Sequence, residues 1–127
     1  MRARWRGFWS LILVLAVTLT ACRPPGLPRV VKIGLAAPFE GQHRSLGYDA
    51  ITAARLAVRE INAQGGVGGY NIELVAYDDR ADPTLARTVA RNLSIDPDVV
   101  AVIGSCQQRT LTAAAPLYAE AGLPLIA

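Results

Sequence analysis

The residue best placed for covalent chemistry is Cys22, which follows Leu19-Thr20-Ala21 at the end of an apolar run. Three arginines precede the apolar segment 11–19. A basic start, an apolar segment and small residues before a cysteine follow the order of a lipoprotein signal. We therefore expect cleavage before Cys22, transfer of diacylglycerol to its thiol, and anchoring on the outer face of a membrane. An ordinary cleaved signal or a membrane-spanning helix is the alternative, but the apolar stretch is shorter than the roughly 20 residues a span needs.

Few other side chains could do chemistry. Asp78, Asp79 and Asp82 resemble the acidic cluster of a metal or phosphoryl-accepting site, but we favour a structural role for them, in a turn and a helix cap, over a metal site. His43 is the only histidine, so a zinc site or a Ser-His-Asp triad lacks parts. Cys106 has no evident histidine-based dyad, and we expect a small buried residue rather than a nucleophile. The sequence therefore predicts no catalytic residue, no metal, no cofactor and no enzyme.

The net positive charge of the chain comes from the leader. The 127 residues carry 13 Lys and Arg against 10 Asp and Glu. Because three of the basic residues lie in the leader, the remainder is nominally neutral. It has no basic stripe interleaved with aromatic residues, which argues against nucleic-acid binding. We expect a signal peptide over 1–21, a lipidated cysteine with a stiff proline-rich tether over 22–29, and one domain with a single core over 30–127.

Short apolar runs rich in β-branched residues predict four strands, at residues 30–36, 71–77, 99–103 and 123–127. Amphipathic stretches lie between them. This alternation is typical of right-handed βαβ crossovers. We therefore predict an α/β fold, a parallel sheet with helices on both faces in a Rossmann-like lobe. Ligands bind such sheets beyond the carboxyl ends of the strands, so the segments of interest are 37–46, 78–82 and 104–109, together with whatever follows residue 127.

Three helices are expected between the strands. The first spans about 47–64 and ends at the glycine-rich segment 65–69, which follows a helix and precedes a strand. That order predicts a turn rather than a dinucleotide-binding loop. Asp82-Pro83 starts the second helix, with aspartate as the N-cap. The third spans 110–120, where Pro116 predicts a late start or a kink. The expected apolar stripe of the second helix comprises Leu85, Val89 and Leu93.

Several segments of the chain carry a family resemblance, in order and at compatible spacing: 33–38, Glu40-Gly41 with Gly47, 56–69, 77–83, 101–104 and 121–126. Through them the chain from Val30 onward resembles type I periplasmic binding proteins, and most nearly the leucine/isoleucine/valine-binding subunits of ABC importers. The resemblance implies two α/β lobes that trap a small ligand in the cleft between them. It implies that this chain supplies an incomplete N-terminal lobe, as a fragment, a truncated reading frame or a decayed copy.

The resemblance also carries ligand contacts over by position. Leu46 corresponds to a residue that touches the ligand side chain. The loop after the third strand and the start of its helix hold the ligand carboxylate through N–H groups and hydroxyls. The corresponding residues here are Cys106, Gln107, Gln108, Arg109 and Thr110. Arg109 could bind a carboxylate through two hydrogen bonds, and Thr110 could supply a hydroxyl or cap the helix. Some members join the second and third loops by a disulfide, whose positions are Ala81 and Gln107 here, so we expect no such bridge.

Taken together, the sequence predicts an extracytoplasmic, lipid-anchored solute-binding protein that captures an amino acid or a similar small polar ligand and passes it to an ABC permease. One alternative is a membrane-tethered sensor of the same fold that acts on a signalling partner. Neighbouring permease genes would favour transport, and an adjacent kinase would favour sensing. Another alternative is an exported α/β enzyme, for which Asp78 and His43 are the groups to test.

Overall fold

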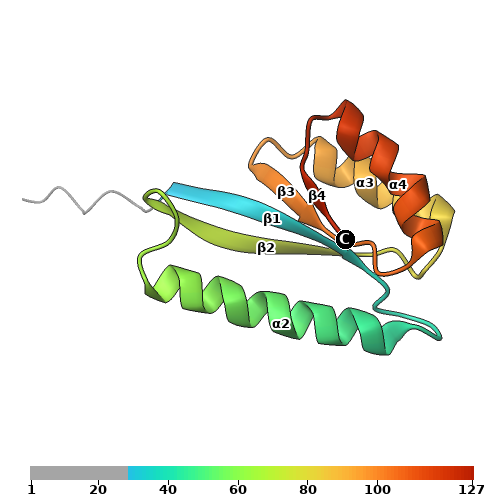
Figure 1. Ribbon diagram of the computed structural model, residues 1–127, viewed down its shortest axis with the longest axis horizontal. Coiled ribbons are helices and arrows are strands. Elements are labelled where there is room, and N and C mark those ends of the chain that lie inside the picture. The colour runs from blue at the N-terminus through green and yellow to red at the C-terminus, as the bar shows by residue number, and fades with distance from the viewer. Residues whose placement is uncertain (1–28) are drawn as a thin grey trace, which may run out of the picture.

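A computed structural model describes residues 29–127 of the chain. The predicted signal peptide and Cys22 lie outside the described residues. The elements are β1 (Arg29–Ala37), α2 (Arg44–Ala63), β2 (Tyr70–Asp78), α3 (Pro83–Ser94), β3 (Val99–Ile103), α4 (Gln108–Glu120) and β4 (Leu125–Ile126), as Figure 1 shows. Strand and helix alternate throughout, as the apolar pattern predicted.

The four strands form one parallel sheet in the order β2-β1-β3-β4. β1 pairs with β2 in unbroken register from Arg29 opposite Tyr70 to Ala37 opposite Asp78. It pairs with β3 up to Leu35 opposite Ile103, and β3 in turn pairs with β4. Parallel neighbours need a crossover connection, and each connection here contains a helix. The predicted fold class, a parallel sheet with helices on both faces, is confirmed.

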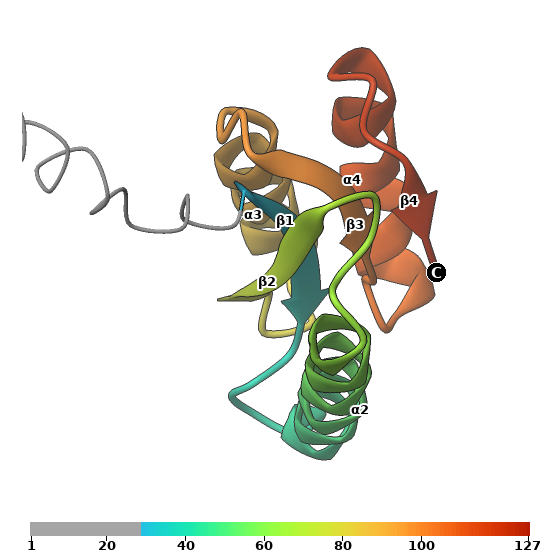
Figure 2. The ribbon, with the colours of Figure 1, turned by 90° about the vertical axis from the view of Figure 1, so that its left-hand side faces the viewer.

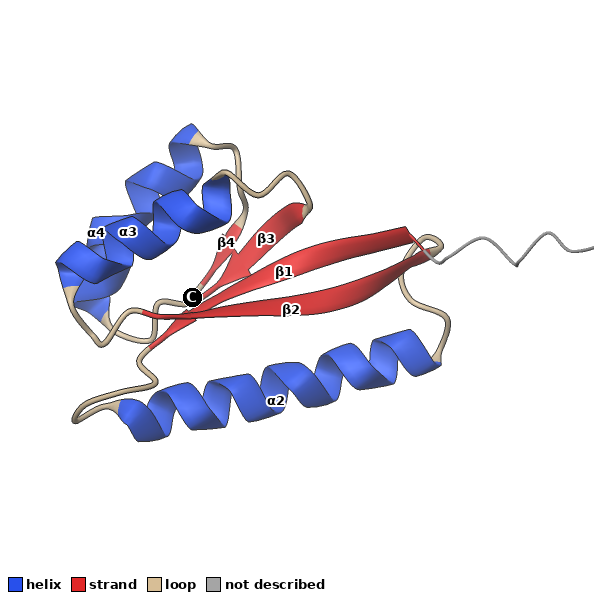
Figure 3. Cartoon of the chain, turned by 180° about the vertical axis from the view of Figure 1, so that it is seen from behind, coloured by secondary structure: helices blue, strands red, loops and turns tan. Residues whose placement is uncertain are grey.

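The helices are divided unequally between the two faces of the sheet. Figure 1 shows α2 along one face and α3 and α4 together on the other, and the views in Figures 2 and 3 agree. Of the helices within residues 29–127, none combines the length and apolarity that crossing a bilayer would require.

The face under α3 and α4 is closely packed. Leu93 of α3, Val102 of β3 and Tyr118 of α4 have 0–1% of their surface exposed. A Cβ at Gly34 would stand 2.9 Å from a methyl carbon of Leu93, so the absence of a side chain at Gly34 lets the helix approach the strand. Full burial of a side chain such as Leu93 stabilises the fold by roughly 1.5–3 kcal/mol. The hydrophobic core therefore lies on this side of the sheet.

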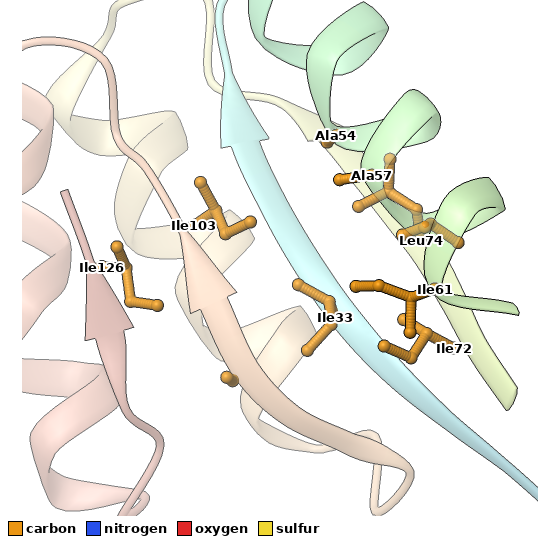
Figure 4. Close-up of a pocket in the computed structure, with 10 residues that line it drawn as sticks. Ile33, Ala54, Ala57, Ile61, Ile72, Leu74, Ile103 and Ile126 are labelled. Carbon is orange, nitrogen blue, oxygen red and sulfur yellow. The ribbon is translucent and has the colours of Figure 1, made fainter. Parts of the chain in front are cut away.

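The opposite face is covered by α2 alone. Gly47 is the one buried residue of α2, and Leu56 in the same helix is 49% exposed. A cleft of about 220 Å³ lies between α2 and the sheet and extends across β3 to β4, as Figure 4 shows. Its lining is aliphatic and comprises Ile33, Ala54, Ala57, Val58, Ile61, Ile72, Leu74, Ala101, Ile103 and Ile126. The α2 face is therefore apolar but incompletely filled.

Two helices start earlier than the sequence predicted. α2 begins at Arg44 rather than near residue 47, because the Arg44 N–H already donates to the Gly41 carbonyl. α4 begins at Gln108 rather than Thr110. Of the two outcomes expected from Pro116, a late start or a kink, the late start is wrong, because α4 begins at Gln108 and continues through Pro116 to Glu120.

The predicted apolar stripe of α3 also needs correction. Leu85 is 37% exposed, whereas Val89 and Leu93 are buried as expected. Ala86 and Ala90 complete the buried side. Leu85 lies in the first turn, where the spacing that joins residues 86, 89, 90 and 93 turns it away from the sheet.

The strand bounds shift by smaller amounts. β1 and β2 are each one residue longer at both ends than predicted, and β3 matches its prediction. β4 is limited to Leu125–Ile126, because the Leu123 N–H donates to the Tyr118 carbonyl and Pro124 has no N–H to give. The glycine segment 65–69 forms the predicted turn, in which a Cβ on Gly66 would stand 2.0 Å from the Tyr70 carbonyl oxygen.

Candidate functional site

Three loops leave the sheet at the same edge. Ala37 at the end of β1 pairs with Asp78 at the end of β2. Leu35 of β1 pairs with Ile103, the last residue of β3. The carboxyl ends of the three strands therefore lie side by side, and the segments that follow them are 38–43, 79–82 and 104–107 (Figure 1). This is the edge at which parallel sheets bind ligands.

The loop after β3 is pressed against β1 at Gly104. This residue has a φ of 106°, and a Cβ on it would stand 2.1 Å from the Ala36 carbonyl oxygen. A side chain is therefore excluded here by both backbone conformation and space. The next residue, Ser105, is 5% exposed, and the chain then turns outward before it enters α4.

Cys106 lies where the loop turns outward, and the expectation that it is buried is wrong. It forms no disulfide within residues 29–127. Partial burial of the thiol, together with the nearby charge of Asp79, raises its pKa above the usual value of 9.0. Because the thiolate is the reactive form, this environment disfavours nucleophilic chemistry.

The start of α4 has no side-chain cap. Gln107 occupies the N-cap position in an extended conformation, and its side chain makes no capping hydrogen bond. Thr110 is fully buried, and its hydroxyl donates to the Gln107 carbonyl over 2.9 Å, so it does not cap the helix either. The first N–H groups of a helix lack backbone acceptors and carry partial positive charge. The first turn of α4 therefore offers donors to an anion.

Arg109 adds a full positive charge to this turn. Gln108 and Arg109 are both exposed, and Arg109 forms no ion pair within residues 29–127. Its charge does reach Asp82, whose pKa is lowered from 3.8 mainly by the N–H groups of Leu85 and Thr84 and to a smaller extent by Arg109. The guanidinium is thus available to an acidic group of a ligand.

The loops after β1 and β2 are tied together by Asp78. Its Oδ1 accepts hydrogen bonds from the Phe39 N–H at 2.7 Å and from the Arg80 N–H at 2.9 Å. The Arg80 guanidinium forms ion pairs with Glu40 and with Asp78. Sequence reasoning missed the pair of Arg80 with Glu40, although opposite charges in two loops at one sheet edge were a usable signal once the strand order is known.

The left-handed backbone of Arg80 and Ala81 shows how tightly that second loop is constrained. Their φ values are 50° and 56°, a conformation that costs roughly 1–3 kcal/mol per residue without glycine. The loop is held in it by hydrogen bonds from the Arg80 and Ala81 N–H groups to the carboxylates of Asp78 and Asp79.

The three aspartates of the acidic group have separate structural roles. Asp78 links two loops, Asp79 is fully buried, and Asp82 caps α3 by accepting from the Thr84 and Leu85 N–H groups at 2.6 and 3.0 Å. The turn-and-cap interpretation of this segment is confirmed. Among residues 29–127 no three His, Cys, Asp or Glu side chains are grouped as a metal ion would require.

Leu46 reaches the same edge from the other face of the sheet. It lies in the first turn of α2, rather than in the loop, and is 45% exposed. The next residue, Gly47, is packed so closely that a Cβ would stand 2.0 Å from the Pro38 carbonyl oxygen. Because α2 and α4 start at one edge on opposite faces (Figure 3), Leu46 and the segment 106–110 border it from two sides.

The model of the periplasmic binding protein family matches residues 30–127. An amino acid binding protein of Pseudomonas aeruginosa is 37% identical over 93 residues, which are 73% of this chain and 25% of the relative. The Leu/Ile/Val-binding protein of Escherichia coli is 31% identical over 96 residues, 76% of this chain and 26% of the relative. The chain thus spans about a quarter of the length of the curated relatives it matches.

Solved structures agree with this match. A putative branched-chain amino acid ABC transporter from Rhodospirillum rubrum superposes with a TM-score of 0.73 at 35% identity, over 76% of this chain and 28% of the other. A branched-chain amino acid transporter substrate-binding protein from Streptococcus pneumoniae, solved with isoleucine, gives the same TM-score, identity and coverage.

Proposed function

The chain belongs to the periplasmic binding protein family, and from that membership we propose that residues 30–127 form one lobe of an extracytoplasmic solute-binding protein. The proposed ligand is an amino acid or a similar small molecule with a carboxylate, which is bound without chemical conversion. The proposed recipient is an ABC permease. The observation that carries this proposal is the uncapped start of α4 beside Arg109, which forms no ion pair within residues 29–127, at the carboxyl edge of the sheet.

The chemistry of that turn suits a carboxylate. The free N–H groups at the start of α4 would donate to its oxygens, assisted by the positive end of the helix. The Arg109 guanidinium would add a charge-assisted contact, which is stronger than a neutral hydrogen bond. Gln107 and Gln108 would supply amide donors to other polar groups of the ligand, and the exposed apolar side chain of Leu46 would border its side chain.

The proposed location depends on the leader. We infer that Cys22 is acylated and that the segment 22–29 tethers the domain to the outer face of a membrane. The support is the order of basic, apolar and small residues before Cys22. Mass spectrometry of the protein extracted from its source membrane tests this, because acylation adds diacylglycerol mass to a peptide that begins at Cys22. An unmodified peptide starting there would contradict the anchor.

Ligand binding is tested by an NMR titration of the full chain with amino acids, each paired with its carboxamide. We expect leucine and related amino acids to shift the backbone amide signals of residues 107–110. Leucinamide, which lacks the negative charge, is expected to bind at least about fivefold more weakly. Arg109→Gln is expected to weaken leucine binding about tenfold, which corresponds to about 1.4 kcal/mol.

Arg91→Gln is the matched control, because Arg91 is also an exposed helical arginine but lies in the last turn of α3, away from the start of α4. We expect it to leave leucine binding unchanged. Equal weakening by both substitutions would reduce the effect to net charge. No response to any member of an amino acid, amide and short-peptide panel would contradict the proposed ligand class.

A further inference from the structure

Three exposed arginines of α2, Arg44, Arg55 and Arg59, make no ion pair within residues 29–127. They are spaced by eleven and four residues, which brings them to one side of a helix with 3.6 residues per turn. The linear sequence shows no basic stripe, because only the helix brings these positions together. We call this surface the basic flank of α2.

The acidic residues of α2 lie on a different strip of the helix. Asp49 follows Arg44 by five residues, and Glu60 follows Arg55 by five. A step of five residues turns a side chain by about 140° around the helix axis. Neither carboxylate therefore falls on the basic flank, and neither forms a salt bridge with an arginine of α2.

Exposed apolar side chains lie beside these arginines. Tyr48 is 57% exposed and Leu56 is 49% exposed. Tyr48 lies four residues after Arg44, and Leu56 lies three residues before Arg59, so each is a neighbour of an arginine on the helix surface. Arginines next to exposed tyrosine and leucine are typical of helices that lie on a lipid surface.

The basic flank lies next to the outer edge of the sheet, at β2. The side-chain amide of Asn62 donates to the Ile72 carbonyl and accepts from the Ile72 N–H, each at 2.8 Å. Asn62 follows Arg55 by seven residues, which is close to two full turns, so both residues lie on the same side of α2. Because β2 is an edge strand, the flank borders a free edge of the described lobe.

The proposed tether reaches the lobe at the end of α2. Arg29, the first residue of β1, pairs with Tyr70, the first residue of β2. Tyr70 follows the glycine turn that leaves α2, so α2 ends where β1 begins (Figure 1). The Arg29 guanidinium lies 5.9 Å from the centre of the Tyr70 ring and adds a positive charge there. A tether over 22–29 would therefore hold the Arg59 end of α2 near the membrane.

We propose that the basic flank of α2 docks on anionic lipid headgroups of the membrane that carries the Cys22 anchor. This inference rests on the proposed acylation of Cys22 and adds an electrostatic attachment to it. A guanidinium binds a phosphate through two hydrogen bonds, and each arginine near an anionic surface favours the docked state by about fivefold. The tether supplies a high effective concentration of headgroups.

Docking on this flank would orient the candidate ligand site. α2 lies along the strands of the sheet (Figure 3), so a docked α2 places the strands roughly parallel to the membrane. The carboxyl edge, with the segment 106–110, then opens along the membrane surface. An undocked lobe would instead hold this edge away from the membrane, because the tether joins the opposite edge at Arg29.

Energy transfer from a dye on Cys106 to labelled lipid headgroups tests the docking. Cys106 is exposed and lies at the carboxyl edge, which docking brings closer to the membrane. The acylated full chain is placed in vesicles of phosphatidylcholine with or without phosphatidylglycerol. We expect more transfer with phosphatidylglycerol, and loss of this gain in salt, because the screening length falls from about 10 Å in 0.1 M salt to about 3 Å in 1 M salt.

Paired substitutions test whether the flank is responsible. Arg55→Gln combined with Arg59→Gln is expected to lower the ratio of docked to undocked chains roughly 25-fold, because two arginines are lost. Arg87→Gln combined with Arg91→Gln is the matched control, since these are also exposed arginines four residues apart, but on α3. We expect the control to keep the gain in transfer. Equal loss in both pairs would reduce the effect to net charge and overturn the proposal.

The outcomes separate the docking from the proposed anchor, because the mass of the labelled chain shows whether Cys22 carries lipid. An acylated chain with equal transfer in both kinds of vesicle overturns the docking while the anchor stands. An unacylated chain contradicts the anchor, but a gain in transfer with phosphatidylglycerol would still support the docking. A gain seen only in vesicles that contain proteins of the source membrane would assign the flank to a protein partner and overturn the proposal.

Discussion

The two faces of the sheet are built from similar aliphatic residues but are filled differently. Under α3 and α4, Leu93, Val102 and Tyr118 are nearly or fully buried. Under α2, the apolar side chains border a cleft of about 220 Å³ that reaches β4. Two helices close one face and a single helix covers part of the other. Stability in this domain therefore rests mainly on the α3/α4 face, and the α2 face retains apolar surface that remains available for contact.

The largest expected effect on the free energy of unfolding tests this difference in packing between the two faces. Leu93→Ala removes a side chain with 1% exposure that packs on Gly34, and we expect it to lower the free energy of unfolding by about 3 kcal/mol. Ile61→Ala, the matched change on the cleft side of α2, should cost less than about 2 kcal/mol because Ile61 is only partly buried. Urea denaturation measures both. Equal losses would contradict the contrast between the faces.

A smaller effect concerns how the helices of the two faces begin. Asp82 caps α3, whereas His43 at the start of α2 makes no side-chain cap. Asp82→Ala should therefore lower the melting temperature, and His43→Ala should change it little. Thermal unfolding followed by circular dichroism measures both substitutions. A larger effect of the histidine substitution would contradict this difference between the two helix starts.

The same cap gives a pH dependence. The pKa of Asp82 is lowered from 3.8 because the folded state donates two N–H groups to its carboxylate. The stabilisation is fully present above pH 3.8 and is lost as the pH falls through the lower folded-state pKa. Asp82→Asn keeps the acceptor but does not titrate, so its stability should decline less over that acidic range. Parallel acid-unfolding curves for the two proteins would contradict this assignment.

The last prediction concerns the incompletely filled face and the edge strand β4, where a substitution of Ile126 should change stability least but should change self-association. Ile126 is 63% exposed and borders the cleft. Ile126→Lys should reduce self-association of the chain, because a charge on an edge strand opposes pairing with another strand. Sedimentation at increasing protein concentration measures this. Ile95→Lys is the control, since Ile95 is 79% exposed but follows α3, and an equal effect there would point to net charge alone.

The local signals in the sequence were strong enough for most elements. Asp82-Pro83 predicted the start of α3 correctly, and the run at Val99–Ile103 predicted β3 without error. Pro116 misled the prediction of where α4 starts, because the cost of a proline inside a helix is outweighed here by the burial of residues such as Ala114 and Tyr118 against the core. Cys106 and Leu85 were expected to be buried and are exposed, because burial depends on the direction in which the backbone leaves a strand or enters a helix.

The sequence likewise predicted some features of the candidate site and not others. The roles of Leu46 and of residues 106–110 came from a family resemblance and stay predictions. The carboxyl edge itself followed from the alternation of strand and helix. The ion pair of Arg80 with Glu40 joins residues from two loops, and the close approach of Gly104 to the Ala36 carbonyl joins a loop to a strand. Neither leaves a periodic signal in the sequence.

The sequence by itself determined the order of the elements and the parallel α/β fold, because apolar periodicity, caps and turns act over a few residues at a time. The resemblance of its motifs indicated the family, which the family match then showed. Tertiary structure decided which face of the sheet is closely packed and which side chains at the carboxyl edge are exposed. These properties depend on distances between residues such as Ala36 and Gly104 that lie far apart along the chain. Only the register of the strands and the packing of the helices fix those distances.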